Sequence, residues 1–224
     1  MDKVAIITGA ARGIGLATAK IFLQQNYKVV IVDRDKNEVN KLKLKNDKLL
    51  KYICDISDPK KNKSMIEDIY KWGKRIDILV NNAGVADFGK IETVKFKNWR
   101  KIMDTNLDGT FLTTQNVIKY LKKTKGNIIN IASISGLRAS TLRIAYGTSK
   151  AAIIQLTQQQ AIELGEFGIR VNCVSPGPVK TKLAQAVHTP DIVKAYHDSI
   201  PLNRYGMEND CLLYTSDAAD DTCC

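Results

Sequence analysis

The sequence predicts an α/β protein with a doubly wound parallel sheet. Short apolar strands alternate with helical patterns through most of the 224 residues. The strands are almost continuously apolar, as expected for strands that helices cover on both faces. The polar motifs of the chain follow the strands, and in a doubly wound sheet the carboxyl ends of the strands border the ligand crevice.

The first half of the chain contributes three strands. A turn with three glycines separates the first strand from a helix that begins near Leu16. The second and third strands each end on an acid, Asp33 and Asp55. Between these strands, lysines alternate with apolar residues, which indicates an amphipathic helix with a solvated face. The three strands are expected at residues 4–7, 28–33 and 49–55.

The second half continues the alternation. Ser57-Asp58-Pro59 is a good helix start, and this helix should run to about Trp72. A long helical region should be interrupted near Thr105. The strands are expected at residues 76–80, 127–132 and 168–174, and the helices at 96–123 and 145–164. Six strands therefore form one sheet, and no repeat or low-complexity linker divides the chain.

Composition excludes several classes of function. The net charge of +11 comes from scattered lysines without interleaved aromatic residues, so nucleic-acid binding is not expected. No stretch approaches the roughly 20 apolar residues of a membrane span. The N-terminus lacks the regions of a signal peptide, which predicts a cytoplasmic protein. The five cysteines and two histidines show no metal-ligand spacing, so no metal site is expected.

The glycine turn is the first candidate binding motif. Gly9, Gly13 and Gly15 lie between a strand and a helix. Glycines at a helix start let backbone N–H groups approach a ligand, and the helix dipole favours an anion such as a dinucleotide pyrophosphate there. The spacing G-x-x-x-G-x-G differs from the common G-x-G-x-x-G fingerprint. An ordinary strand-to-helix turn therefore remains an alternative at this point.

Asp33 lies about 20 residues beyond the glycines, at the end of the second strand. In a dinucleotide-binding fold, a carboxylate there accepts hydrogen bonds from the adenosine ribose. It would repel a 2′-phosphate, which favours NAD(H) over NADP(H). Arg12 and Arg34 could neutralise a phosphate, so NADP(H) stays open as a cofactor.

Tyr146 and Lys150 are four residues apart, which places them on one face of a helix. A phenol has an ordinary pKa of about 10, and a nearby ammonium group lowers it. The pair can thus donate and accept a proton near neutral pH. Ser133, at the end of the fifth strand, could hold a substrate oxygen beside the Tyr146 hydroxyl.

Taken together, the motifs resemble the short-chain dehydrogenase/reductase family over residues 2–210. In this family the cofactor loop has the G-x-x-x-G-x-G spacing. The resemblance rests on the order and spacing of residues 8–15, Asn81-Asn82-Ala83-Gly84, Asn106, Ser133, Tyr146 with Lys150, and residues 176–181. It implies a Rossmann-like sheet, a nicotinamide cofactor that carries the hydride, and an alcohol or ketone as substrate.

The resemblance also implies the roles of four catalytic residues. Tyr146 would be the general acid and base. Lys150 would lower the pKa of Tyr146 and hold the nicotinamide ribose. Ser133 would orient the substrate oxygen, and Asn106 would hold a water that links Lys150 to solvent.

Cofactor contacts follow from the same resemblance. Asp55 would contact the adenine, and residues 82–84 the adenosine side. Residues 176–181 would border the nicotinamide and its phosphate. The expected cofactor-binding set is Gly9, Arg12, Gly13, Ile14, Gly15, Asp33, Asp55, Ile56, Asn82, Ala83, Gly84, Tyr146, Lys150, Pro176, Gly177, Val179 and Thr181.

The substrate itself is left open. Specificity should come from Ser135, Arg138, Leu142 and Arg143, and from Leu183, Val187 and Tyr196 in a lid after Thr181. These residues mix basic and apolar groups, so an acidic or phosphorylated substrate is one option. A sugar or polyol dehydrogenase and a 3-oxoacyl-carrier reductase both fit. A non-catalytic dinucleotide-binding fold is the alternative from another class.

The last fourteen residues depart from the family pattern. They contain three acids, no lysine or arginine, and three of the five cysteines. We therefore expect a dinucleotide-binding domain at residues 1–210 and a foreign tail at 211–224, with the seventh strand of the family missing. The resemblance implies a homodimer or homotetramer, which the lost strand would impair.

Overall fold

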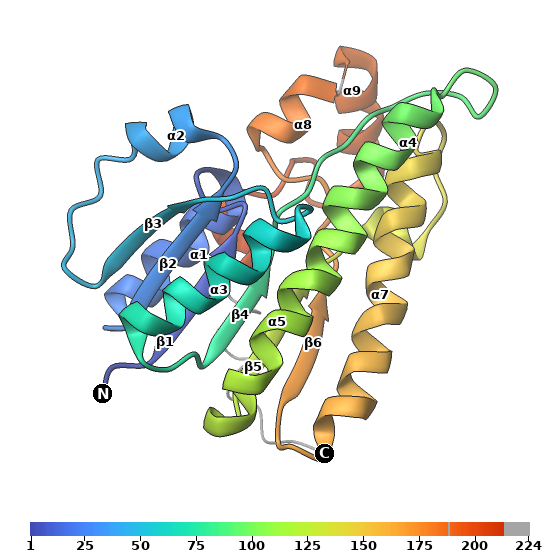
Figure 1. Ribbon diagram of the computed structural model, residues 1–224. Coiled ribbons are helices and arrows are strands. Elements are labelled where there is room, and N and C mark those ends of the chain that lie inside the picture. The colour runs from blue at the N-terminus through green and yellow to red at the C-terminus, as the bar shows by residue number, and fades with distance from the viewer. Residues whose placement is uncertain (188, 213–224) are drawn as a thin grey trace.

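The computed structural model of the protein, described for residues 1–187 and 189–212, contains a parallel sheet in the order β3-β2-β1-β4-β5-β6 (Figure 1). The order reverses at the neighbouring strands β1 and β4, which creates a switch point at their carboxyl ends. The predicted fold class is confirmed. The strands are β1 (Val4–Thr8), β2 (Lys28–Asp33), β3 (Leu49–Ile53), β4 (Ile78–Asn81), β5 (Asn127–Ile131) and β6 (Arg170–Val174).

Helices cover the sheet on both faces. Figure 1 shows α3 (Pro59–Gly73), α5 (Gly109–Thr124) and α7 (Ile144–Gly165) side by side on one face, with α1 (Gly13–Gln24) on the other. Shorter helices lie beyond the carboxyl ends of the strands. These are α2 (Lys36–Lys41), α4 (Phe96–Met103), α6 (Ile134–Leu137), α8 (Lys182–Val187) and α9 (Pro190–Ser199).

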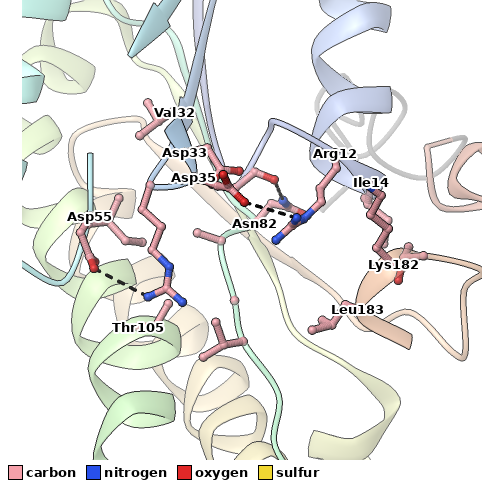
Figure 2. A pocket seen from close by; sticks show the side chains of 18 of the residues that line it. Arg12, Ile14, Val32, Asp33, Asp35, Asp55, Asn82, Thr105, Lys182 and Leu183 are labelled. Atoms are coloured by element: carbon pink, nitrogen blue, oxygen red, sulfur yellow. Dashed lines mark hydrogen bonds and ion pairs between the residues drawn. The ribbon is translucent and has the colours of Figure 1, made fainter. Parts of the chain in front are cut away.

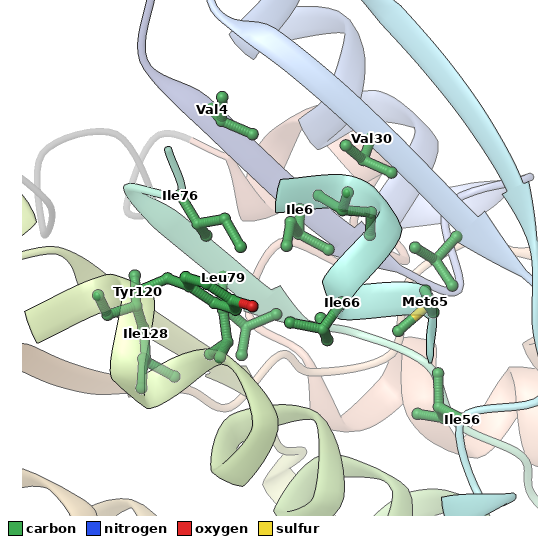
Figure 3. Packing of buried hydrophobic residues seen from close by; sticks show 14 of the residues in the cluster. Val4, Ile6, Val30, Ile56, Met65, Ile66, Ile76, Leu79, Tyr120 and Ile128 are labelled. Atoms are coloured by element: carbon green, nitrogen blue, oxygen red, sulfur yellow. The ribbon is translucent and has the colours of Figure 1, made fainter. Parts of the chain in front are cut away.

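Alternation along the strands builds a core on each face. In β1, Val4 and Ile6 pack with α3 and α5, whereas Ala5 and Ile7 pack with α1. All four residues are fully buried. Figure 3 shows the first of these cores, in which Ile66 of α3 and Ile76, just before β4, lie near Ile6. Two apolar faces on one strand produce the continuous apolar run seen in the sequence.

The predicted start of α3 is confirmed. The Asp58 carboxylate caps the helix by accepting hydrogen bonds from the N–H groups of Lys60 and Lys61, at 3.1 and 3.0 Å. Pro59 occupies the first turn, where its missing N–H costs nothing. The helix ends at Gly73, one residue beyond the predicted end, and Lys74 closes it in the left-handed conformation.

The interruption predicted near Thr105 is a π-helical turn, Asp104–Asp108. It joins α4 to α5 so that the three segments form one continuous helical stretch. The extra residue of a π turn places Thr105 and Asn106 inward together, at 6% and 1% exposure. The π turn therefore directs Asn106 into the interior beside the loop that follows β4.

The last described residues lie beside α1. β6 forms one edge of the six-stranded sheet, and Asn172 is exposed on it. A short 3₁₀ turn, Glu208–Cys211, is the last element before Leu212. Residues 213–224, which include most of the expected foreign tail, lie outside the described residues. No helix within residues 1–187 or 189–212 combines the length and apolar character needed to cross a membrane.

Candidate active site

The glycine turn forms an open cradle at the start of α1. Gly9 and Gly13 adopt positive φ angles of +63° and +58°, which glycine adopts without steric cost. A Cβ on Gly9 would lie 2.6 Å from the Ala83 Cα, so the backbones of two loops approach closely here. The side chain of Arg12 at the helix N-cap makes no capping hydrogen bond. The first N–H groups of α1 can therefore donate hydrogen bonds to an anion.

Asn82 connects this turn to the end of β4. Its Nδ2 donates to the carbonyls of Thr8 and Gly9, each at 3.0 Å. A Cβ on Gly15 would lie 2.5 Å from Asn82 Nδ2 and 2.7 Å from the Gly9 carbonyl. Gly15 is thus buried beneath the turn and does not line the cleft. Close packing of α1 on the loop explains why position 15 has no side chain.

Asp33 is held rigidly at the end of β2. Its carboxylate accepts hydrogen bonds from the N–H groups of Ala11 and Asp35, at 3.1 and 3.0 Å. The first of these bonds links the acid directly to the glycine turn. The carboxylate therefore has a fixed position on the wall of the cleft, as the predicted ribose contact requires.

Two ion pairs flank Asp33 (Figure 2). Arg12 Nη1 lies 3.6 Å from the Asp35 carboxylate, and Arg34 Nη1 lies 3.7 Å from that of Asp55. Burial acts to raise the pKa of Asp55, but hydrogen bonds from Ser57 and the charge of Arg34 lower it overall. Both arginines that could neutralise a phosphate thus already have an acid beside them.

These residues border two neighbouring spaces that share lining residues. The outer cleft, about 320 Å³, lies between the glycine turn and the ends of β2 and β3. The inner pocket, about 140 Å³, lies over β5 and α7. Of the predicted residues, the outer cleft is lined by Gly9, Arg12, Gly13, Ile14, Asp33, Asp55, Ile56, Asn82, Ala83, Gly84 and Thr181. The inner pocket is lined by Ser133, Tyr146, Lys150, Pro176, Gly177 and Val179, and again by Ile14, Asn82, Gly84 and Thr181.

The hydroxyls of Ser133 and Tyr146 meet in the inner pocket. Ser133 caps α6, and its Oγ accepts the N–H of Ser135 at 3.1 Å. Burial raises the pKa of the Tyr146 phenol, against the opposite effects of its hydrogen bond with Ser133 and of the Arg143 charge. The phenol is therefore neutral near pH 7 and ready to donate a proton.

Lys150 lies one turn beyond Tyr146 along α7 and is buried. Its Nζ donates to the Ile131 carbonyl at 2.7 Å and lies 5.9 Å from the centre of the Tyr146 ring. Burial lowers the pKa of Lys150 to about 8. Burial is the dominant effect on the pKa of both groups. The expected effect of Lys150 on the pKa of Tyr146 stays a prediction.

A pH-dependent stability penalty is expected from Lys150. Its folded pKa of about 8 lies below the ordinary value of 10.5, so burying the charge destabilises the folded state. The penalty is full below pH 8 and fades as the pH rises to 10.5. The excess stability of Lys150→Met over the unmodified chain should therefore shrink by roughly 3 kcal/mol from pH 7 to 10.5. Urea unfolding at several pH values measures this difference; a difference independent of pH would contradict a buried charge.

Asn106 lies behind the site rather than in it. Its Oδ1 accepts the Val85 N–H at 2.8 Å, and its Nδ2 donates to the Val85 carbonyl and to Ser149 Oγ, each at 3.0 Å. It lines neither the cleft nor the pocket. A Cβ on Gly84 would lie 3.4 Å from Asn106 Oδ1 and 3.5 Å from Lys150 Nζ, so Asn106 fixes the loop that passes Lys150.

Several lining residues were not predicted. Asp35, Cys54 and Lys182 line the outer cleft, and Phe88 lines the inner pocket. Asp35 could have been noticed as a second acid after β2. Phe88 could not have been predicted from the sequence, because the loop between β4 and α4 shows no hydrophobic periodicity.

The expected specificity residues fall into three groups. The inner pocket is lined by Ser135, Arg143, Leu183 and Tyr196, but not by Arg138 or Leu142. The side chain of Val187 lies outside the described residues.

The sequence is similar to a large group of known oxidoreductases. The family model described as short chain dehydrogenase matches residues 3–191. The chain is 34% identical to a 3-oxoacyl-[acyl-carrier-protein] reductase of Thermotoga maritima, covering 91% of this chain and 85% of that protein. It is 35% identical to an NAD-dependent glycerol dehydrogenase of Listeria innocua, covering 97% and 88%.

Solved structures show the same relationship. A 3-ketoacyl-(acyl-carrier-protein) reductase from Brucella melitensis complexed with NADH has a TM-score of 0.90 at 30% identity, covering 97% of this chain and 90% of the other. ElxO with NADP bound also has a TM-score of 0.90, at 29% identity, covering 99% and 93%. This chain is therefore an oxidoreductase that belongs to the short-chain dehydrogenase family.

Proposed function

We propose that the chain interconverts a secondary alcohol and a ketone with NAD(H) as the preferred cofactor and Tyr146 as the proton donor and acceptor. The observation that carries the proposal is the inner pocket. The hydroxyls of Tyr146 and Ser133 meet there, and the pocket shares lining residues with a cleft that has Asp33 on its wall. The outer cleft would thus hold the adenosine half of a dinucleotide, and the inner pocket would hold the nicotinamide beside the reacting oxygen.

The residues fit the cofactor. The uncapped N-terminus of α1 and the turn around Gly9 would hold the pyrophosphate. Asp33 would bind the adenosine ribose, with Asp55 and Ile56 beside the adenine. Residues 176–181 and the Lys150 ammonium would hold the nicotinamide half, with Lys150 at its ribose. When bound, the nicotinamide supplies the acceptor or donor of the hydride.

The protein's own groups handle the proton. In ketone reduction, the neutral Tyr146 phenol donates its proton to the substrate oxygen, and Ser133 donates a hydrogen bond to the same oxygen. In alcohol oxidation, the phenolate accepts the proton. The Lys150 cation, close behind, stabilises the phenolate once substrate and cofactor exclude water from the pocket. Asn106 would position the loop at residues 84–85 and would take no direct part in the proton transfer at Tyr146.

Cofactor preference follows from charge at the outer cleft. Asp33 is fixed by two N–H groups, and the two nearby arginines each lie beside an acid. A 2′-phosphate would therefore face a carboxylate without an arginine held solely for it. This arrangement supports NAD(H) over NADP(H).

Asp33→Asn tests this assignment. The amide keeps the shape and one acceptor oxygen but removes the charge. We expect the preference for NADH over NADPH to fall by roughly 10-fold to 100-fold. Titration of both cofactors, followed by nicotinamide fluorescence, measures it. Asp47→Asn, an exposed acid outside the cleft, is the control. An unchanged ratio in Asp33→Asn would remove Asp33 from the role given to it.

The substrate class is a small alcohol or ketone, of the sugar and polyol type or of the 3-oxoacyl type. Both types occur among the relatives by name. A non-catalytic fold is disfavoured because both hydroxyls and the lysine are in place. No turnover on a carbonyl panel by a chain that binds NADH would favour it. The cytoplasmic location and the homodimer or homotetramer stay predictions.

A further inference from the structure

A chain of buried hydrogen bonds links the loop after β4 to the helix that carries Tyr146. Asn106 of the π turn binds both backbone groups of Val85, accepting its N–H at 2.8 Å and donating to its carbonyl at 3.0 Å. The same Nδ2 of Asn106 donates to Ser149 Oγ at 3.0 Å, and Ser149 Oγ donates to the Tyr146 carbonyl at 2.7 Å. The chain therefore connects the wall of the outer cleft, which Val85 lines, to the backbone of α7.

The direction of every bond in this chain is fixed by its partners. The Tyr146 carbonyl can only accept, so the Ser149 hydroxyl donates to it and accepts from Asn106. Val85 offers one donor and one acceptor to Asn106, which fixes the position of the amide oxygen. Asn106 is 1% exposed and Ser149 is fully buried, so water competes little for these bonds. The chain should therefore be rigid.

The hydroxyl at position 149 is not explained by the helix itself. Serine within a helix is less favourable than alanine, because its hydroxyl competes for backbone partners. The neighbouring Thr148 also donates to a carbonyl of α7, that of Ile144, at 2.6 Å. That bond stays within the helix, and Thr148 is exposed. Of these two neighbours, Ser149 is the one whose hydroxyl joins α7 to another segment.

The first turn of α7 needs such an anchor. Tyr146 is the third residue of the helix, and Gly147, which follows it, gives the backbone more freedom than a residue with a side chain would. Among the described contacts, the side chain of Arg143 at the N-cap does not cap the helix. The π turn packs against α7 and brings Asn106 to Ser149. The bond from Ser149 to the Tyr146 carbonyl therefore holds the turn that carries the reacting hydroxyl.

We infer that Ser149 is a positioning residue that, through Asn106, links the first turn of α7 to the loop bordering the cofactor cleft. In this way the Tyr146 hydroxyl keeps its place beside Ser133. This inference rests on the proposed function and adds a residue to it. Ser149 lies outside the described linings of the cleft and the pocket, so it acts through the backbone of Tyr146. A displacement of about 1 Å at a reacting group can lower a rate roughly 100-fold.

Ser149→Ala tests the inference by steady-state kinetics. With NADH, the reduction of dihydroxyacetone or ethyl 3-oxobutanoate should show a kcat about 10-fold below that of the unmodified chain, with KM for the ketone changed by less than about twofold. Thr148→Ala is the matched control and should keep kcat, because it removes a bond that stays within the helix. Ser149→Cys retains a weak donor of similar size, so its kcat should lie between those of the unmodified chain and Ser149→Ala.

A purely structural role for Ser149 predicts a different result. In that case Ser149→Ala would lower the urea midpoint of unfolding but leave the kcat of the folded protein unchanged. Ile153→Val provides the comparison, since it removes one buried methyl group from the same helix without touching the hydrogen-bond chain. A kcat that falls equally in both variants would mean a general loosening of α7 and would overturn the inference.

Amide hydrogen exchange, followed by NMR, gives a readout that does not depend on turnover. In Ser149→Ala, the Val85 N–H should exchange about 5-fold faster, because Asn106 loses one of the bonds that hold it. Thr148→Ala should leave this rate unchanged.

The outcomes separate this inference from the proposed function. An unchanged Val85 exchange rate in Ser149→Ala, or a faster rate with full kcat, overturns the inference and leaves the proposed function standing. Binding of NADH by the unmodified chain with no turnover on a carbonyl panel overturns both.

Discussion

Tyr146→Phe should lower kcat by roughly a thousandfold or more while leaving NADH binding nearly unchanged. The variant keeps the ring on α7 and removes the hydroxyl that exchanges a proton with the substrate. General acid–base catalysis contributes about 10²-fold to 10⁴-fold, and the phenol is the group that meets Ser133 in the inner pocket. Initial rates with NADH and a ketone measure the loss, and fluorescence titration measures binding.

The control for this variant is the same change elsewhere. Tyr27→Phe removes a hydroxyl from a ring that packs against Phe22, far from the cleft in the fold. It should leave kcat unchanged. Tyr146→Phe that retains the wild-type kcat would disprove the assigned proton transfer. Loss of NADH binding together with kcat would show that the variant damages the site rather than the chemistry.

Gly9→Ala is expected to weaken NADH binding by about 10-fold or more and to destabilise the fold by about 2–4 kcal/mol. The left-handed conformation at φ +63° costs an L-residue roughly 1–2 kcal/mol. The new Cβ would also lie 2.6 Å from the Ala83 Cα, so one of two backbones must move. The movement displaces the loop that borders both the cradle and the cleft. Fluorescence titration and urea unfolding measure the two effects.

Gly165→Ala is the matched control. Gly165 ends α7, and a Cβ there meets nothing within 4 Å. The substitution should leave NADH affinity unchanged and alter stability by less than about 1 kcal/mol. Equal effects of the two glycine variants would mean that the Gly9 turn tolerates a side chain, and would contradict the close approach described here.

The fold was predictable because both faces of each strand are apolar. β1 shows this directly, since Val4 and Ala5 pack into different cores. The limits of β4 were less accurate. The strand begins at Ile78 instead of residue 76, because the buried Asp77 carboxylate accepts the Val4 N–H at 2.8 Å and pairs with Arg75. Here a side-chain carboxylate accepts a hydrogen bond from a backbone N–H group of the neighbouring strand. Hydrophobic periodicity does not reveal such a bond.

The residue identities of the site were more predictable than their electrostatics. Spacing alone placed Tyr146 and Lys150 on one helix face. It could not show that burial raises the pKa of Tyr146 and lowers that of Lys150, because burial depends on how segments distant in sequence pack around the two side chains. Nor could it show that Asn106 would bind a loop, since the π turn that directs it inward depends on tertiary packing.

Lys182 of α8 and Glu38 of α2 form an ion pair at 3.2 Å beside the outer cleft, which Lys182 lines. The two residues are 144 positions apart in sequence. Because the lysine is 65% exposed, water and salt screen the pair, and it contributes at most about 1 kcal/mol. Thermal motion breaks a contact of this strength readily. Opening of this edge to a dinucleotide would therefore cost little free energy and would break no contact of the hydroxyls at the start of α6 and on α7.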